Sequence, residues 1–199
     1  MYIEMALLAV ILGLVLGGSL KKLIDLKIRW ISLLLVSVFA SLLPQIPWLG
    51  VTLAGFGTTA AFMVAVLRYG FLLAFAGLNY RYIPVCVIGA GGLSNFIVTL
   101  ANGGRMPVSP EALVVGAKDA SVALVKGGFI LNYKVADAGT RLRPLCDIIQ
   151  ARGIYIYFLS VGDILISIGI FALIIQLMEP KLLTRALARI HTKPPVKRR

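Results

Sequence analysis

The sequence predicts an all-α protein whose helices form a bundle in a membrane. Hydrophobic residues make up 59% of the chain, and the mean hydropathy is +0.94, whereas only about half of a soluble domain is normally apolar. The apolar residues come in long blocks rather than in a helical or strand alternation, which is typical of membrane-crossing segments. Although the net charge is +12, the cations gather at the ends of these blocks, as the positive-inside bias predicts. This distribution indicates membrane lipids as partners and argues against nucleic acid.

Five apolar segments approach the ~20 residues that are needed to cross ~30 Å of hydrocarbon. They cover residues 3–20, 30–49, 58–79, 83–101 and 153–178, and together they predict a single membrane domain over residues 1–179. The second segment ends near Leu43 if Pro44 and Pro47 break the helix, or near Leu49 if they only kink it. In the first segment, Ala9, Gly13 and Gly17 recur at four-residue spacing. This spacing permits a close helix contact, although glycine also occurs simply as filler in membrane helices.

The charges that flank the segments predict an orientation. Lys21, Lys22, Lys27 and Arg29 follow the first segment against a single acid, which places that loop in the cytoplasm and the N-terminus outside. Five crossings then leave residues 102–152 as an outer loop and residues 180–199 as a basic cytoplasmic tail, expected to begin as an amphipathic helix on the inner leaflet. Two alternatives, a cleaved signal peptide at the first segment and a loop at Arg68, fit the pattern less well.

Two charged residues fall inside predicted spans. Arg68 and Asp163 each lie about ten residues into a segment that runs inward, so we expect them at similar depth. An unpaired charge there costs about 2.5–3.5 kcal/mol or more, which favours an ion pair facing the bundle interior. Such a pair either fixes how two helices meet or contributes a protonatable Asp163 to an ion or substrate path.

The stretch from Asn102 to Glu111, NGGRMPVSPE, predicts a shaped turn at the outer surface. Its asparagine and two glycines suit the end of a helix, and Ser109-Pro110-Glu111 suits the start of another that would lie in the interface to about Lys126. Arg105 would then sit at headgroup level, where its guanidinium either binds a phosphate or carboxylate or extends to lipid headgroups.

A second polar cluster precedes the last segment. Thr140, Arg141, Arg143 and Asp147 lie close together in the sequence. They either neutralise one another in a solvated loop or share a ligand site with Asn102 and Arg105. The two cysteines and the single histidine have no metal-ligand spacing, so we expect neither a metal nor another cofactor.

Three motifs occur in order along the chain: NGGRMPV at residues 102–108, TxLxxLxD at residues 140–147, and SxGD at residues 160–163. With these motifs the whole chain resembles a bacterial family of small multi-pass membrane proteins that is known only as a domain of unknown function. The resemblance implies a bacterial cytoplasmic membrane location and adds weight to Asn102, Arg105, Pro107, Asp147 and Asp163. It supplies no activity, substrate or catalytic residue.

Taken together, these features favour a non-enzymatic membrane protein that binds or transports a small anionic or lipid-like ligand from the outer face. Arg105 and the loop would recognise the ligand, and Arg68 with Asp163 would form the buried polar element. One alternative is a structural or accessory subunit with a membrane-protein partner. An intramembrane enzyme ranks last, because no nucleophile, base or metal set is present.

Overall fold

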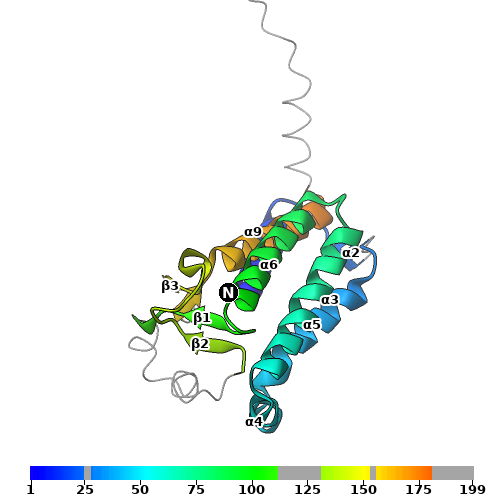
Figure 1. The fold of residues 1–199 in the computed structure, drawn as a ribbon. Helices are drawn as coiled ribbons and strands as arrows, with labels where there is room; N and C mark the ends of the chain where they lie inside the picture. Colours follow the sequence, from blue (N-terminus) through cyan, green and yellow to red (C-terminus); the bar gives the residue numbers. More distant parts are fainter. Residues whose placement is uncertain (25–27, 112–130, 153–155, 181–199) are drawn as a thin grey trace, which may run out of the picture.

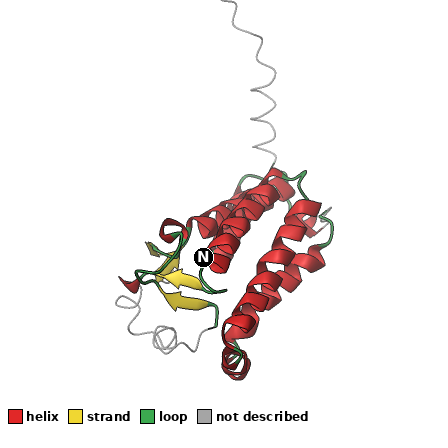
Figure 2. Ribbon diagram, viewed as in Figure 1, coloured by secondary structure: helices red, strands yellow, loops and turns green. Residues whose placement is uncertain are grey.

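The computed structural model describes residues 1–24, 28–111, 131–152 and 156–180. These residues form a helical bundle with a small cap at one end (Figures 1 and 2). The predicted all-α class is confirmed, because helices build the whole bundle. Within the described ranges, strands occur only as two two-stranded sheets in the cap.

Among the described residues, three helices are long and apolar enough to cross a membrane: α5, α6 and α9. They measure roughly 27–33 Å at ~1.5 Å per residue. In chain order, the helices of the bundle are α1 (Tyr2–Val15), α2 (Leu20–Ile24), α3 (Ile31–Leu42), the 3-10 turn η1 (Leu43–Gln45), α4 (Pro47–Gly55), α5 (Gly57–Leu78), α6 (Ile83–Ala101) and α9 (Val161–Met178). The spans predicted over residues 58–79 and 83–101 therefore agree with α5 and α6 to within one residue.

The second predicted span, residues 30–49, is corrected by the structure. Helix α3 ends at Leu42, and the chain bends by 87° before it continues in α4, at the lower end of α5 in Figure 1. Pro44 lies in η1 and Pro47 occupies the first position of α4. Proline lacks the N–H group that a helix interior needs, and its ring clashes with the preceding turn, so the prolines break the helix instead of only kinking it. The two pieces are long and apolar enough to cross only if they count as one broken span.

The first segment is also shorter than predicted. Helix α1 covers 14 residues, roughly 21 Å at ~1.5 Å per residue, and the chain leaves it at Gly17, whose φ is +79°. Ala9 and Gly13 are its buried residues, and a Cβ on Gly13 would lie 2.5 Å from the sulfur of Met178 in α9. The small residues therefore do provide a close helix contact, while Gly17 ends the helix.

Helices α6 and α9 pack against each other through glycines. An added Cβ on Gly91 would overlap the carbonyl oxygen of Gly162, and one on Gly169 would lie 2.8 Å from the carbonyl oxygen of Pro84. Such close backbone approach is possible only without side chains at these positions. The contacts run in opposite directions along the two helices, so α6 and α9 are antiparallel.

Contacts between distant segments define the two ends of the bundle. At one end, the Tyr2 hydroxyl at the start of α1 donates to Asp163 at the start of α9, and the cap follows. At the other end, Lys22 forms an ion pair with Glu179, and Arg29 is hydrogen-bonded to Asn79. The turn at residues 102–105 and the C-terminal end of α9 therefore lie at opposite ends of the bundle, as one crossing between them requires.

The cap occupies most of the segment that was predicted to be an outer loop. It contains β1 (Met106–Val108), which pairs in parallel with β2 (Tyr133–Val135), the 3-10 turn η2 (Arg143–Leu145), and an antiparallel hairpin of β3 (Ile149–Arg152) and β4 (Ile156–Leu159). An isolated bridge between Val108 and Asp147 attaches the end of η2 to β1. Alternation of aromatic and β-branched residues up to Leu159 favours a strand there, so α9 begins at Val161 rather than at residue 153.

Two predicted helices lie mostly or wholly outside the described residues. Pro110 and Glu111 are helical, and Ser109 Oγ accepts a hydrogen bond from the Glu111 N–H at 3.3 Å, as the predicted N-cap requires. The rest of the interfacial helix falls on residues 112–130, and the amphipathic tail falls on residues 181–199; both ranges are outside the description.

Candidate functional site

The NGGR turn joins α6 to β1 through two left-handed glycines. Gly103 and Gly104 have φ values of +75° and +78°, a conformation that side chains disfavour. Gly104 also packs directly on α5, because an added Cβ would lie 2.5 Å from the backbone nitrogen of Phe62. The two glycines therefore reverse the chain against α5 and set Arg105 at the junction of α6, α5 and β1.

Asn102, predicted as a ligand contact, instead binds backbone with its whole amide group. Its Nδ2 donates to the carbonyls of Val98 and Arg141, at 2.9 Å each, and its Oδ1 accepts from the Arg141 N–H at 3.0 Å. The side chain is buried. Asn102 thus fixes the loop that contains Thr140 and Arg141 onto the end of α6.

Arg105 presents a buried donor without an acceptor. Its Nε is shut off from solvent, and no group among the described residues accepts a hydrogen bond from it. Leaving a buried donor unpaired costs about 1–3 kcal/mol, and more for a charged group. A guanidinium nitrogen in this situation is suited to an anionic acceptor brought by a ligand.

Thr140, by contrast, serves its own loop. Its hydroxyl accepts from the Asp137 N–H at 2.8 Å and donates to the Asp137 carboxylate at 3.0 Å. Arg141 and Arg143 beside it are exposed. The expected cluster of Thr140 with Asp147 is therefore divided, because the threonine lies in the surface turn and Asp147 lies inside.

Asp147 reaches a small polar cavity where the cap meets the bundle. The space is about the size of one water molecule. It is lined by residues from three helices, both strands of the parallel sheet and the segment after η2: Arg68, Tyr69, Asn95, Met106, Tyr133, Asp147 and Asp163. This set is called the polar cavity below. Asp147 is 5% exposed, and its Oδ1 has no hydrogen-bond partner among the described residues.

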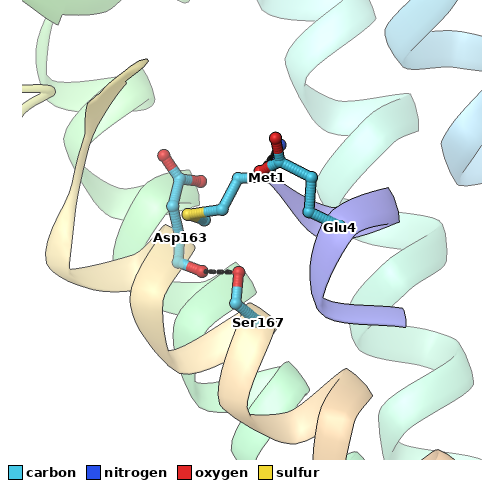
Figure 3. A network of polar contacts seen from close by, with 4 residues as sticks. All are labelled: Met1, Glu4, Asp163 and Ser167. Carbon is cyan, nitrogen blue, oxygen red and sulfur yellow. Dashed lines mark hydrogen bonds and ion pairs between the residues drawn. The ribbon is translucent and has the colours of Figure 1, made fainter. Parts of the chain in front are cut away.

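Asp163 lies in the first turn of α9, not ten residues into a span. Ser160 and Asp163 form a capping box in which the Ser160 hydroxyl accepts from the Asp163 N–H and the Asp163 carboxylate accepts from the Ser160 N–H. The carboxylate also accepts from Tyr2 and, at 2.8 Å, from Asn95 Nδ2. Figure 3 shows Asp163 beside the start of α1, with the Ser167 hydroxyl donating to its carbonyl one turn below.

Arg68 and Asp163 both line the polar cavity, yet the ion pairs seen among the described residues join other groups. The Arg68 guanidinium carbon lies 4.9 Å from the centroid of the Tyr69 ring. The two charges were predicted to lie at similar depth. They do line the same cavity, but they form no ion pair with each other. The Asp163 carboxylate instead accepts hydrogen bonds from Tyr2, from Asn95 and, within the capping box, from the Ser160 N–H.

Three of the residues around these charges, Asn95, Tyr2 and Tyr133, were not singled out from the sequence. Asn95 is a lone amide within an apolar helix, and such polar groups commonly join membrane helices, so it could have been found. Tyr2 and Tyr133 carry no pattern that distinguishes them from interfacial aromatic residues. Only the fold brings them to Asp163 and to the polar cavity.

Burial governs the acid–base properties of the cap groups near the cavity. Burial raises the pKa of the Asp147 carboxyl well above its usual range, the negative charge of Asp163 raises it further, and Arg68 opposes both. Burial also raises the pKa of Tyr133, to about 12, and the pKa of the Cys146 thiol. Among the described residues, no three His, Cys, Asp or Glu side chains are grouped as metal ligands.

Comparison with known proteins gives one match. The family model of DUF5317, described as a family of unknown function, matches residues 25–175, about three quarters of the chain. No curated protein and no solved structure matches the chain.

Proposed function

We propose that this protein binds a small anionic or lipid-like ligand at the capped end of a membrane-embedded bundle. The chain belongs to DUF5317, a family of unknown function. The apolar helices α5, α6 and α9 make it compatible with an integral membrane protein. In this proposal the bacterial cytoplasmic membrane holds the bundle, with the N-terminus and cap outside and the C-terminal tail in the cytoplasm. Lys21, Lys22, Arg29 and Arg81 at the end opposite the cap support this orientation.

The single observation that carries the proposal is the buried Nε of Arg105, for which no described residue supplies an acceptor. The two left-handed glycines and the packing of Gly104 on Phe62 fix where the backbone of Arg105 leaves the end of α6. One oxygen of a phosphate or carboxylate would accept from the Nε–H, and a second oxygen of the same group would accept a parallel hydrogen bond from the same guanidinium.

The surroundings of Arg105 favour an anion over a neutral ligand. Asn102 fixes the backbone of Arg141 beside the turn, and Arg143 follows two residues later. Both arginines are exposed, and Asp137 and Asp147 are the acids that flank them in the sequence. The local excess of positive charge would attract an anionic headgroup or a dissolved phosphate to the same place.

Native mass spectrometry of the full chain tests the proposal. The protein would be released from nanodiscs that contain phosphatidylglycerol and phosphatidylcholine, and separately from detergent with inorganic phosphate. We expect retention of the anionic species, reduced about 10-fold or more by Arg105→Gln, because hydrogen bonds to charged groups contribute ~1.5–3 kcal/mol. Arg105→Lys keeps the charge but removes the Nε–H, so its retention of the anionic species should lie between that of the wild type and that of Arg105→Gln.

Arg29→Gln is the matched control, since Arg29 is an exposed arginine at the opposite end that binds Asn79 through its backbone. Equal losses in Arg105→Gln and Arg29→Gln would mean general charge attraction and would contradict the proposal. Retention of a second membrane protein instead of an anion would contradict it as well and would favour an accessory subunit. The nanodisc and phosphate arms distinguish a lipid headgroup from a free anion.

A further inference from the structure

The two carboxyl groups of the polar cavity have different hydrogen-bonding environments. Both oxygens of Asp163 accept hydrogen bonds, from Tyr2, from Asn95 and from the Ser160 N–H. Oδ1 of Asp147, in contrast, is buried and accepts none from the described residues. A buried carboxylate oxygen without a donor is strongly unfavourable, whereas a protonated carboxyl group needs less compensation.

The charges that face the cavity lead to the same conclusion. Arg68 is the only cation among its described lining residues, and Asp147 and Asp163 are the two acids. If both acids were ionised, the cavity would contain one negative charge more than Arg68 balances, and an uncompensated buried charge is costly. If one of the two acids is protonated, a single negative charge remains in the cavity to balance Arg68. Tyr69 and Tyr133 are the other titratable side chains that line the space.

The position of Asp147 connects this charge balance to the attachment of the cap. Its N–H donates to the Pro107 carbonyl, and its own carbonyl accepts from the Ser109 N–H, at 3.0 Å each. The backbone of Asp147 is therefore bound to β1 and to the residue that follows it, while its side chain lines a cavity shared with helices of the bundle. We infer that Asp147 is a proton-binding site whose occupancy holds the cap on the bundle. This inference does not require the ligand proposed for Arg105.

The direction of the pH effect follows from the environment of the group. Burial and the charge of Asp163 raise the pKa of Asp147 above its value in the unfolded chain, and Arg68 only partly opposes this. The stabilisation is then fully present below the ordinary aspartate pKa and is lost as the pH rises through the raised value. Lys134 and Arg143 act on the neighbouring Cys146 thiol and are not among the residues that line the cavity. The cap should therefore be held more loosely in alkaline than in acidic solution.

Infrared spectroscopy of the full-length protein in nanodiscs provides the test. We expect a protonated-carboxyl C=O band that disappears reversibly as the pH rises and is lost in Asp147→Asn. Hydrogen exchange of residues 131–147, corrected for the intrinsic pH dependence, should accelerate in the wild type across the same pH range but not in Asp147→Asn. Asp137→Asn is the matched control, because Asp137 is an exposed aspartate of the same cap. It should keep both effects.

A band unchanged in Asp147→Asn, or no titrating carboxyl band in the wild type, would overturn the inference. So would a titration midpoint that moves with sodium concentration, because a metal cation would then compete for the site. If Asp147→Asn fails to fold, Asp147→Glu supplies the second variant. It keeps a carboxyl group, so it should shift the band and its midpoint, and an unshifted band would place the proton elsewhere.

Discussion

Asn79 and Asn102 end consecutive helices at opposite ends of the bundle, and each binds the backbone of a distant arginine in the same way. Asn79 donates from Nδ2 to the carbonyl four residues earlier, Phe75, and to the carbonyl of Arg29. Its Oδ1 accepts from the Arg29 N–H at 3.0 Å. Asn102 makes the equivalent three bonds to Val98 and Arg141.

The likeness extends to the residue after each arginine. Trp30 and Leu142 have φ values of +56° and +54°, and each is the N-cap of a following helical turn. A side chain in this conformation is strained, and each strained residue directly follows the arginine that the asparagine holds. One local device, an asparagine that binds an arginine's backbone and a left-handed residue after it, thus closes both ends of the bundle.

What differs is the chain that follows each asparagine. After Asn79, a short turn leads directly into α6. After Asn102, the glycine pair bends the chain against α5 and leads into Arg105 and the cap. The comparison shows that the hydrogen bonds of Asn102 match those of Asn79, whereas the buried atoms without a partner among the described residues, Arg105 Nε and Asp147 Oδ1, both lie after the glycine pair.

The largest effect should come from the feature that distinguishes the two ends. Gly104→Ala forces a side chain into a left-handed conformation and against the backbone of Phe62. Strain of ~1–2 kcal/mol and overpacking of ~1–3 kcal/mol predict a loss of about 2–5 kcal/mol in unfolding free energy. Gly103→Ala has the same strain but open space around the added Cβ, so it should lose only ~1–2 kcal/mol. Denaturant titration in micelles measures both, and equal losses would show that packing on α5 is unimportant.

The next effect tests the likeness itself. Asn79→Ala and Asn102→Ala each remove three hydrogen bonds to backbone and should each cost about 2–3 kcal/mol, because partner groups are left unpaired. Hydrogen exchange should locate the two effects separately: near residues 28–33 for Asn79→Ala, and in residues 136–147 for Asn102→Ala. If both variants loosened the same region, the two ends would not be independent.

The smallest effect concerns the left-handed residue. Leu142 is 44% exposed, so truncating it removes little packing. We expect Leu142→Gly to be more stable than Leu142→Ala by about 1 kcal/mol, because only glycine adopts this φ without strain. Thermal unfolding of the two variants side by side measures the difference. An alanine variant as stable as the glycine variant would mean that the turn relaxes once the leucine is gone.

Local patterns in the sequence were sufficient for the parts of the fold that depend on one segment. The third and fourth apolar blocks match α5 and α6, and the NGG sequence does supply the positive φ values. Hydropathy places the start of α9 too early, because the apolar run includes the preceding strand. The capping-box spacing of Ser160 and Asp163 marks the observed start of the helix. The predicted ion pair of Arg68 with Asp163 could not be judged from local sequence. The Asp163 carboxylate binds Tyr2 and Asn95 instead, and these residues lie 161 and 68 positions away from it in the chain.

The sequence by itself determined that the chain is a set of apolar helices with a shaped glycine–arginine turn, because hydropathy, proline and glycine act over a few neighbouring residues. Only the tertiary structure decided that the Asn102 amide binds the backbone of Arg141, that Asp147 shares a cavity with Arg68 and Asp163, and that the buried Arg105 Nε has no acceptor among the described residues. Hydrogen bonding and desolvation depend on which atoms come within about 3 Å of each other. Those neighbours are set by how helices pack and not by their order along the chain.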